Sequence, residues 1–314
     1  MSSSPTIDGV LVQWGERLFY PGNRIVKSRT PRLGPFSSRA DAIRSRIEST
    51  VRRAPQVMVK VTGGGRGMKA IAAHFRYICK NGQLQIEDDR GIVERGRDVL
   101  QDIERQWRYG GAFIDDLGYR REAFNVMLSM PKGTDPLILQ KVAREFAKIE
   151  FADHRYVMVL HTHQANPHVH LSVKAESKHG ERLNPRKADL HRWRETFAER
   201  LREWGIDAEA TRQAVRGAVR NYPELWRKKA TEEGRARAAR PERKVGAAAL
   251  ASRRTAGEAW GTIAAALRAS PDPKDKKLAS DIERFVTGRA LDRPATKEHS
   301  RVTQEPQRDL GRSR

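Results

Sequence analysis

The stretch His161-Thr162-His163-Gln164-Ala165-Asn166-Pro167-His168-Val169-His170 holds four of the nine histidines of this chain within ten residues. The residues before it, 156–160, are β-branched, aromatic or long and apolar, which is typical of a strand. Residues 164–167 then favour a four-residue hairpin loop, and alternation resumes over 168–173. A simple hairpin predicts that His163 faces His168 and His161 faces His170. The two-residue period of a strand places all four imidazoles on one face of the sheet.

Four imidazoles at one place need a chemical explanation. A single histidine on a strand is most often a structural residue with an ordinary hydrogen bond. Four that converge repel one another when charged, and when neutral and buried they leave ring nitrogens without partners. A bound cation removes both problems. Because Cys79 is the only cysteine, a zinc finger built on paired cysteines is excluded.

The same residues carry a resemblance to a known family. His161, His168 and His170, with Asn-Pro directly before the last pair, resemble the third motif of conjugative relaxases of the mobilisation type (MobP-like). These relaxases are HUH endonucleases, named for two histidines that flank one hydrophobic residue. The resemblance implies that the three histidines bind one divalent cation against the scissile phosphate. This sequence departs from the pattern at His163, where many such relaxases have an acidic residue.

The composition favours a nucleic acid as the partner. The chain has 61 basic and 39 acidic residues, a net charge of +22, and a pI near 10.6, which is typical of proteins that bind polyanions. A solvated basic surface without a specific partner is the alternative. A single cysteine excludes an internal disulfide, and the sequence has neither a long apolar run nor an apolar signal core. We therefore expect a cytoplasmic protein without a membrane span.

A glycine-rich loop and the helix after it contain a second group of candidates. Residues 63–67 do not match a nucleotide-binding P-loop, but their amides, with Arg66 and Lys69, can receive a phosphate. Periodicity predicts a helix from residue 68 to about residue 80, with Tyr77 outside its apolar stripe. This stretch resembles the first relaxase motif, which implies Tyr77 as the catalytic nucleophile. An ordinary surface tyrosine is the alternative, and Tyr109 is the reserve candidate.

Two further contacts with DNA are expected elsewhere. A strand predicted over 124–131, with the turn and helix after it, resembles the second relaxase motif, in which a serine or its neighbours contact the DNA backbone. Ser129 is the matching position, although a plain serine at a strand end is an equally good interpretation. Arg182 is the other candidate, and it precedes a helix predicted over 187–204.

The pattern of elements predicts an α+β fold with a central antiparallel sheet flanked by helices, because the histidine hairpin requires antiparallel neighbours. The family resemblance implies the same fold. We expect three regions: a basic, mostly disordered leader over residues 1–54, a relaxase-like nuclease domain over 55–215, and a basic tail over 216–314. In the tail, helices are predicted over 256–267 and 275–288, without a second core.

The predicted function is nicking of one DNA strand and strand transfer through a 5′-phosphotyrosine intermediate, which starts plasmid or element mobilisation. The resemblance implies Mg²⁺ or Mn²⁺ as cofactor, whereas three imidazoles suit Zn²⁺ equally well. It also implies a transfer origin as substrate, with accessory relaxosome and secretion coupling proteins as partners. Two alternatives remain: a rolling-circle replication initiator, and a non-catalytic basic DNA-binding protein with a structural metal site.

Overall fold

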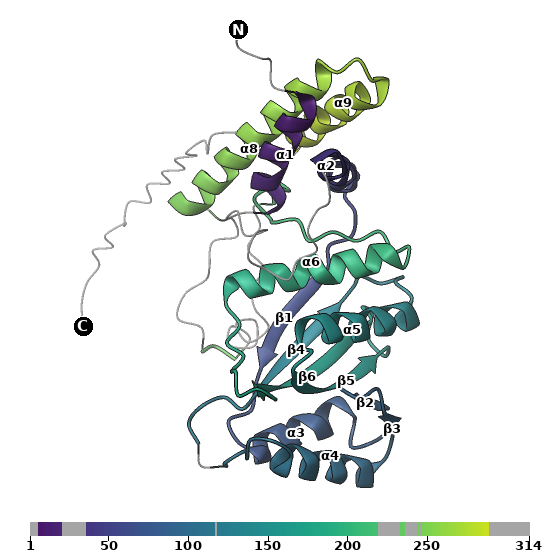
Figure 1. Ribbon diagram of the computed structural model, residues 1–314, viewed down its shortest axis with the longest axis vertical. Coiled ribbons are helices and arrows are strands. Elements are labelled where there is room, and N and C mark those ends of the chain that lie inside the picture. Colours follow the sequence, from purple (N-terminus) through teal and green to yellow (C-terminus); the bar gives the residue numbers. More distant parts are fainter. Residues whose placement is uncertain are drawn as a thin grey trace, which may run out of the picture.

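The computed structural model describes residues 6–20, 36–116, 118–218, 233–235, 244 and 246–288. Its centre is a six-stranded sheet in the order β1-β4-β6-β5-β2-β3, and all its strand pairs are antiparallel. Two layers of helices cover this sheet (Figure 1). The α+β prediction is confirmed. The elements of this part are β1 (Met58–Gly63), α3 (Met68–Ile78), β2 (Ile86–Asp88), β3 (Val93–Glu94), α4 (Arg97–Tyr109), β4 (Ala123–Ser129), α5 (Pro136–Glu150), β5 (His154–His161), β6 (His168–Ser177) and α6 (Lys187–Glu203).

The face of the sheet beneath α5 and α6 is an apolar core. In β6, Val169, Leu171 and Val173 are fully buried against aromatic residues of the two helices. The rings of Phe146 and Trp193 pack edge to face with centroids 6.5 Å apart, a preferred geometry for aromatic pairs. Asp135 is the N-cap of α5 and fixes where the helix begins. Its carboxylate accepts hydrogen bonds from two backbone amides of the first turn.

The opposite face, covered by α3 and α4, is mixed. The predicted apolar stripe of α3 is buried, and Phe75 meets Trp107 of α4 edge to face at 4.9 Å. Beside this second core, β6 carries His168, His170, Ser172 and Lys174 in alternating positions. Lys174 Nζ donates to three carbonyl oxygens at or just beyond the end of α4, those of Trp107, Gly110 and Ala112. The alternation of β6 therefore separates an apolar face from a polar one.

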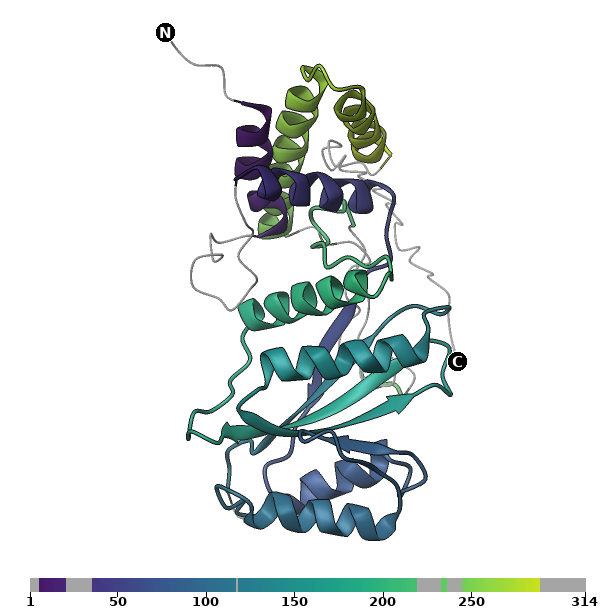
Figure 2. The same ribbon diagram turned by 45° about the vertical axis from the view of Figure 1, so that its right-hand side comes forward.

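A four-helix unit lies beyond α6, on the side away from α3 and α4 (Figure 2). It consists of α1 (Ile7–Phe19), α2 (Phe36–Val51), α8 (Ala247–Arg268) and α9 (Pro273–Thr287). Its core is built around Trp260, which is fully buried against Phe19 and Phe285. The predicted tail helices are confirmed. The predictions of a disordered leader over 1–54 and of a tail without a core are wrong for the described residues, because α1, α2, α8 and α9 bury apolar faces against one another.

A buried ion-pair network joins this unit to the part of the protein that contains the sheet. Arg46 of α2 lies 2.8 Å from Glu195 of α6 and 3.0 Å from Glu209, and all three side chains are almost completely buried. Thr50 and Thr211 also share a hydrogen bond of 3.2 Å across the junction. Removal of one partner would leave a buried charge uncompensated, so the network fixes how α2 meets α6.

None of the helices in the described part of the chain combines the length and the hydropathy that a membrane span needs.

Candidate metal centre

The ends of β5 and β6 bring His161, His168 and His170 together. One ring nitrogen of each lies within 4.8 Å of the others, and their ring centroids are 4.7 to 5.0 Å apart. The register pairs His161 with His168 and Val159 with His170. The three side chains thus project from two adjacent antiparallel strands onto the face covered by α3.

The predicted register of the hairpin is wrong by two residues. The loop spans residues 162–167, and His163 lies in it instead of on a strand. The loop is held by β4 and the segment after it: the Pro167 carbonyl accepts bonds from the Ser129 hydroxyl at 3.2 Å and the Met130 amide at 3.3 Å. The Asn166 side chain accepts another from the Lys132 amide at 3.0 Å. A shift of two residues preserves the face, so the predicted convergence survives for three of the four histidines.

Backbone hydrogen bonds fix which nitrogen two of the rings present. His161 lies with Nε2 2.6 Å from the Ile78 carbonyl, and His168 with Nδ1 3.0 Å from the Asn166 carbonyl. A carbonyl oxygen only accepts, so these nitrogens donate and carry the protons of the neutral rings. The lone pairs are left on Nδ1 of His161 and Nε2 of His168. Histidines that bind metals commonly donate their second nitrogen in this way.

Burial disfavours the charged form of two of these imidazoles. Burial first, and after it the surrounding histidines with His161 foremost, lower the pKa of His170 to about 3. Burial also lowers the pKa of His161, although its bond to Ile78 opposes the shift. Nδ1 of His170 is buried without a hydrogen-bond partner among the described residues. Neutral rings with free lone pairs and an unpaired buried nitrogen fit a divalent cation.

Tyr77 lies next to this cluster, on the last turn of α3. Its side chain is 71% exposed, and the carbonyl of the following residue, Ile78, is the one that meets His161. Tyr109 is equally exposed, at 70%, but it lies at the end of α4, where its ring stacks near Phe113. The structure therefore places Tyr77, and not the reserve candidate, beside the three histidines.

His163 lies close to the three-histidine group but does not belong to it. Its ring centroid lies 5.0 Å from that of His161, yet its nitrogens are outside the group that could share an ion. The side chain is exposed in the loop. This position is accessible to a substrate bound over the cluster.

The four expected DNA contacts have different surroundings. Arg66 and Lys69 are exposed at the start of α3. Ser129 is buried, and its hydroxyl donates to Pro167. Arg182 is partly exposed and forms ion pairs with Glu176 at 2.9 Å and Glu122 at 3.2 Å. The first two are free to meet a phosphate, whereas Ser129 and Arg182 have partners within the protein and support the hairpin loop and β6.

Sequence reasoning missed His74. It is on α3, one turn before Tyr77, and its ring lies between those of Tyr77, at 6.2 Å, and His170, at 6.4 Å. Burial lowers the pKa of His74 to about 4, and its Nε2 is buried without a hydrogen-bond partner in the described chain. The three-residue spacing from Tyr77 was the available signal, because positions i and i+3 are neighbours on a helix.

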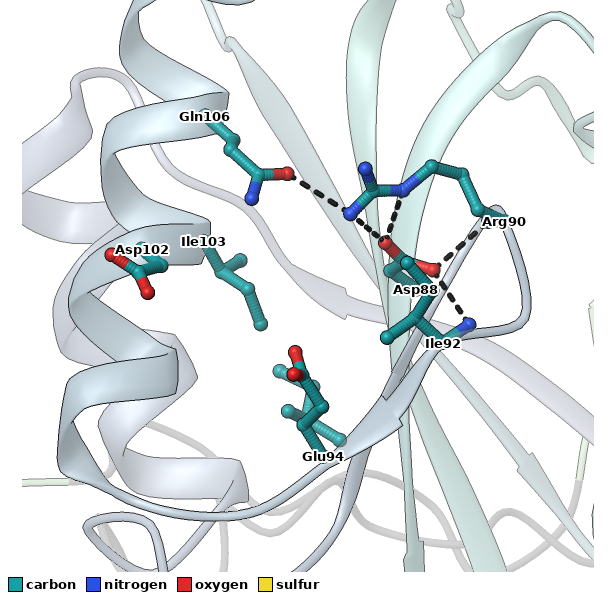
Figure 3. A pocket seen from close by; sticks show the side chains of 8 residues that line it. Asp88, Arg90, Ile92, Glu94, Asp102, Ile103 and Gln106 are labelled. Atoms are coloured by element: carbon teal, nitrogen blue, oxygen red, sulfur yellow. Dashed lines mark hydrogen bonds and ion pairs between the residues drawn. The ribbon is translucent and has the colours of Figure 1, made fainter.

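A separate pocket of about 240 Å³ lies at the far edge of the sheet, between β2, β3 and α4 (Figure 3). Its Asp88 binds Arg90 and the backbone amides of Arg90 and Ile92, which closes a turn. Asp102 and Glu94 also line it. Three carboxylates make this pocket unsuited to a phosphate, and no histidine of the cluster contributes to it.

An antiparallel sheet that presents three clustered histidines beside an exposed tyrosine is consistent with a site of the HUH endonuclease type. In agreement, residues 77–206 match the family model of the relaxase MobA/VirD2-like nuclease domain. This span is less than half of the chain, and it contains Tyr77, all four histidines of the hairpin region and α6. The resemblance to relaxases is confirmed for it, and the match indicates a domain for DNA nicking and mobilisation. No curated protein matches the chain.

Proposed function

We propose that this protein is a metal-dependent, site-specific relaxase that nicks one DNA strand through Tyr77 and keeps the strand as a 5′-phosphotyrosine. One observation carries the proposal: the last turn of α3 both exposes Tyr77 and contacts a proposed metal ligand through the 2.6 Å bond from His161 to Ile78. The nucleophile and the cation site are therefore rigidly linked.

His161, His168 and His170 would hold the cation. When bound, it would withdraw charge from the scissile phosphate, which makes the phosphorus easier for a tyrosine hydroxyl to attack. The resemblance to relaxases favours Mg²⁺ or Mn²⁺ as this cation, whereas the preference of imidazole ligands for transition metals favours Zn²⁺. Three protein ligands leave coordination positions open for phosphate oxygens, as catalytic sites require.

The chemical step follows from these positions. Tyr77 Oη forms a bond to phosphorus as its proton leaves, and the bond from phosphorus to the 3′-oxygen breaks, which releases a protonated 3′-hydroxyl. We assign the proton of Tyr77 to His163, which is exposed near the cluster but outside it, and the resulting imidazolium or solvent water supplies the proton of the 3′-hydroxyl. The number of phosphodiester bonds is conserved, so the reverse attack by a 3′-hydroxyl rejoins the strand after transfer.

A nicking assay tests the proposal. Supercoiled plasmid that carries the transfer origin of the parent element should be nicked only with a divalent cation. Denaturing gels should show protein attached to the 5′ end. Tyr77→Phe should abolish the adduct and retain DNA binding, whereas Tyr109→Phe should retain both. Full activity in excess chelator, or an adduct in Tyr77→Phe, would refute the proposed mechanism.

A further inference from the structure

The turn that follows α3 has an uncommon backbone. Lys80, Asn81 and Gly82 have φ angles of +48°, +56° and +86°. Three consecutive residues therefore have a left-handed backbone conformation, which residues other than glycine rarely adopt. The turn is closed by bonds from the Asn81 amide to the Arg76 carbonyl, at 2.8 Å, and from Leu84 to Cys79, at 3.0 Å. The backbone of Lys80 is therefore fixed.

This turn fixes Lys80 beside the three histidines. The Ile78 carbonyl, two residues earlier, is 2.6 Å from Nε2 of His161, and Tyr77 is three residues earlier. Through the bond between Ile78 and His161, the backbone that carries Lys80 is tied directly to the proposed cation site.

Lys80 is also available for a ligand. Its side chain is exposed, and no ion pair to it is present in the described residues. Two nearby basic side chains of this layer have acidic partners instead: Arg76 binds Glu104 at 2.8 Å and Arg108 binds Asp116 at 3.0 Å.

The charge balance of the site calls for an anion. The group that could hold a metal ion contains three histidines and no carboxylate, counting only the described residues. A divalent cation would then carry its full charge next to that of Lys80. Two unbalanced positive charges repel each other unless an anion lies between them.

We propose that Lys80 binds a phosphate of the DNA strand at or next to the scissile one, as a point charge opposite the cation. This inference rests on the proposed function. Lysine suits the role because it binds phosphate without the fork geometry of arginine. In the nicking step, it would stabilise the charge that develops on the phosphate oxygens when Tyr77 attacks.

The test compares Lys80→Gln with Lys148→Gln in the full-length protein. Lys148 is exposed on α5, across the sheet, so the second variant loses the same charge on the far side. Binding of a labelled oligothymidylate is measured with Mn²⁺ over a series of salt concentrations, in a Tyr77→Phe background that prevents chemistry. Lys80→Gln should lower the salt slope of binding by roughly 0.7, the value for one phosphate contact on a single strand. Lys148→Gln should leave it unchanged.

Two further readouts complete the test. Calorimetric titration of Mn²⁺ into Lys80→Gln without DNA should give an affinity at least equal to that of the wild type, and nicking should slow about tenfold or more, with partial recovery in Lys80→Arg. Equal slopes in the two variants, or lost Mn²⁺ binding in Lys80→Gln, would overturn the assignment. If wild-type protein does not nick at all, the proposed function fails, and the difference in slopes still decides whether Lys80 binds phosphate.

Discussion

The two faces of β6 have different roles, one in stability and the other in positioning polar groups. Val169, Leu171 and Val173 face α5 and α6 and are fully buried in an apolar core. His168, His170 and Ser172 alternate with them and face the side of α3, where each has a polar environment. One face contributes stability through burial and the other positions polar groups, and the two-residue period makes this possible within one strand. The predictions below test this division.

The apolar face should dominate stability. Leu171→Ala should reduce the free energy of unfolding by about 2–5 kcal/mol, the range for leucine truncation in a packed core. The neighbouring variant Ser172→Ala removes the 2.8 Å hydrogen bond to Asn125 on the other face, and it should cost only about 1–3 kcal/mol. Urea unfolding of both proteins measures the difference. The division would be contradicted if Ser172→Ala proved the more destabilising.

The polar face should dominate metal binding. His161→Ala removes a proposed ligand, and we expect Mn²⁺ affinity to fall by more than about 100-fold, beyond the usual effect of residues outside the ligand set. Nicking should disappear with it. Leu171→Val, which changes the opposite face, should bind Mn²⁺ normally under conditions where it is folded. Calorimetric titration tests both variants, and normal Mn²⁺ binding by His161→Ala would remove this residue from the ligand set.

The loop residue should affect chemistry more than metal binding. His163→Ala should slow nicking by roughly 100-fold as a proton acceptor is lost, while Mn²⁺ affinity stays within about tenfold. His161→Ala provides the comparison, since it should lose both. If His163→Ala binds Mn²⁺ as weakly as His161→Ala, His163 is a ligand and the proposed triad is wrong.

The polar face should also make stability depend on pH in the metal-free protein. The pKa values of His74 and His170 are lowered by burial to about 4 and about 3, against about 6.5 in an unfolded chain. The unfolded state therefore binds more protons between pH 6.5 and these values, so stability falls as the pH decreases through this window. Each group contributes at most about 1.4 kcal/mol per pH unit.

Urea unfolding at pH 7 and pH 5 in chelator measures this loss. His74→Phe, which keeps a ring of similar size but cannot be protonated, should reduce it. A loss of equal size in this variant would show that the proton uptake belongs to other groups.

The sequence determined the features that depend on local periodicity. The apolar stripe of α3 left Tyr77 at the surface, and alternation along β6 placed His168 and His170 on one face. These outcomes need only the repeat of a helix or a strand, and each residue carries that information in its own neighbourhood.

Tertiary structure decided what depends on contacts between distant segments. The register of the hairpin depends on the bonds from Ser129 and Met130 to Pro167. His163 therefore lies in a loop instead of on the predicted strand. The helical unit forms because residues near the two ends of the chain share the core around Trp260. Arg182 pairs with acids that only β6 and the segment before β4 bring near. Such pairings are set by the free energy of the assembled fold, and no single segment of the sequence contains them.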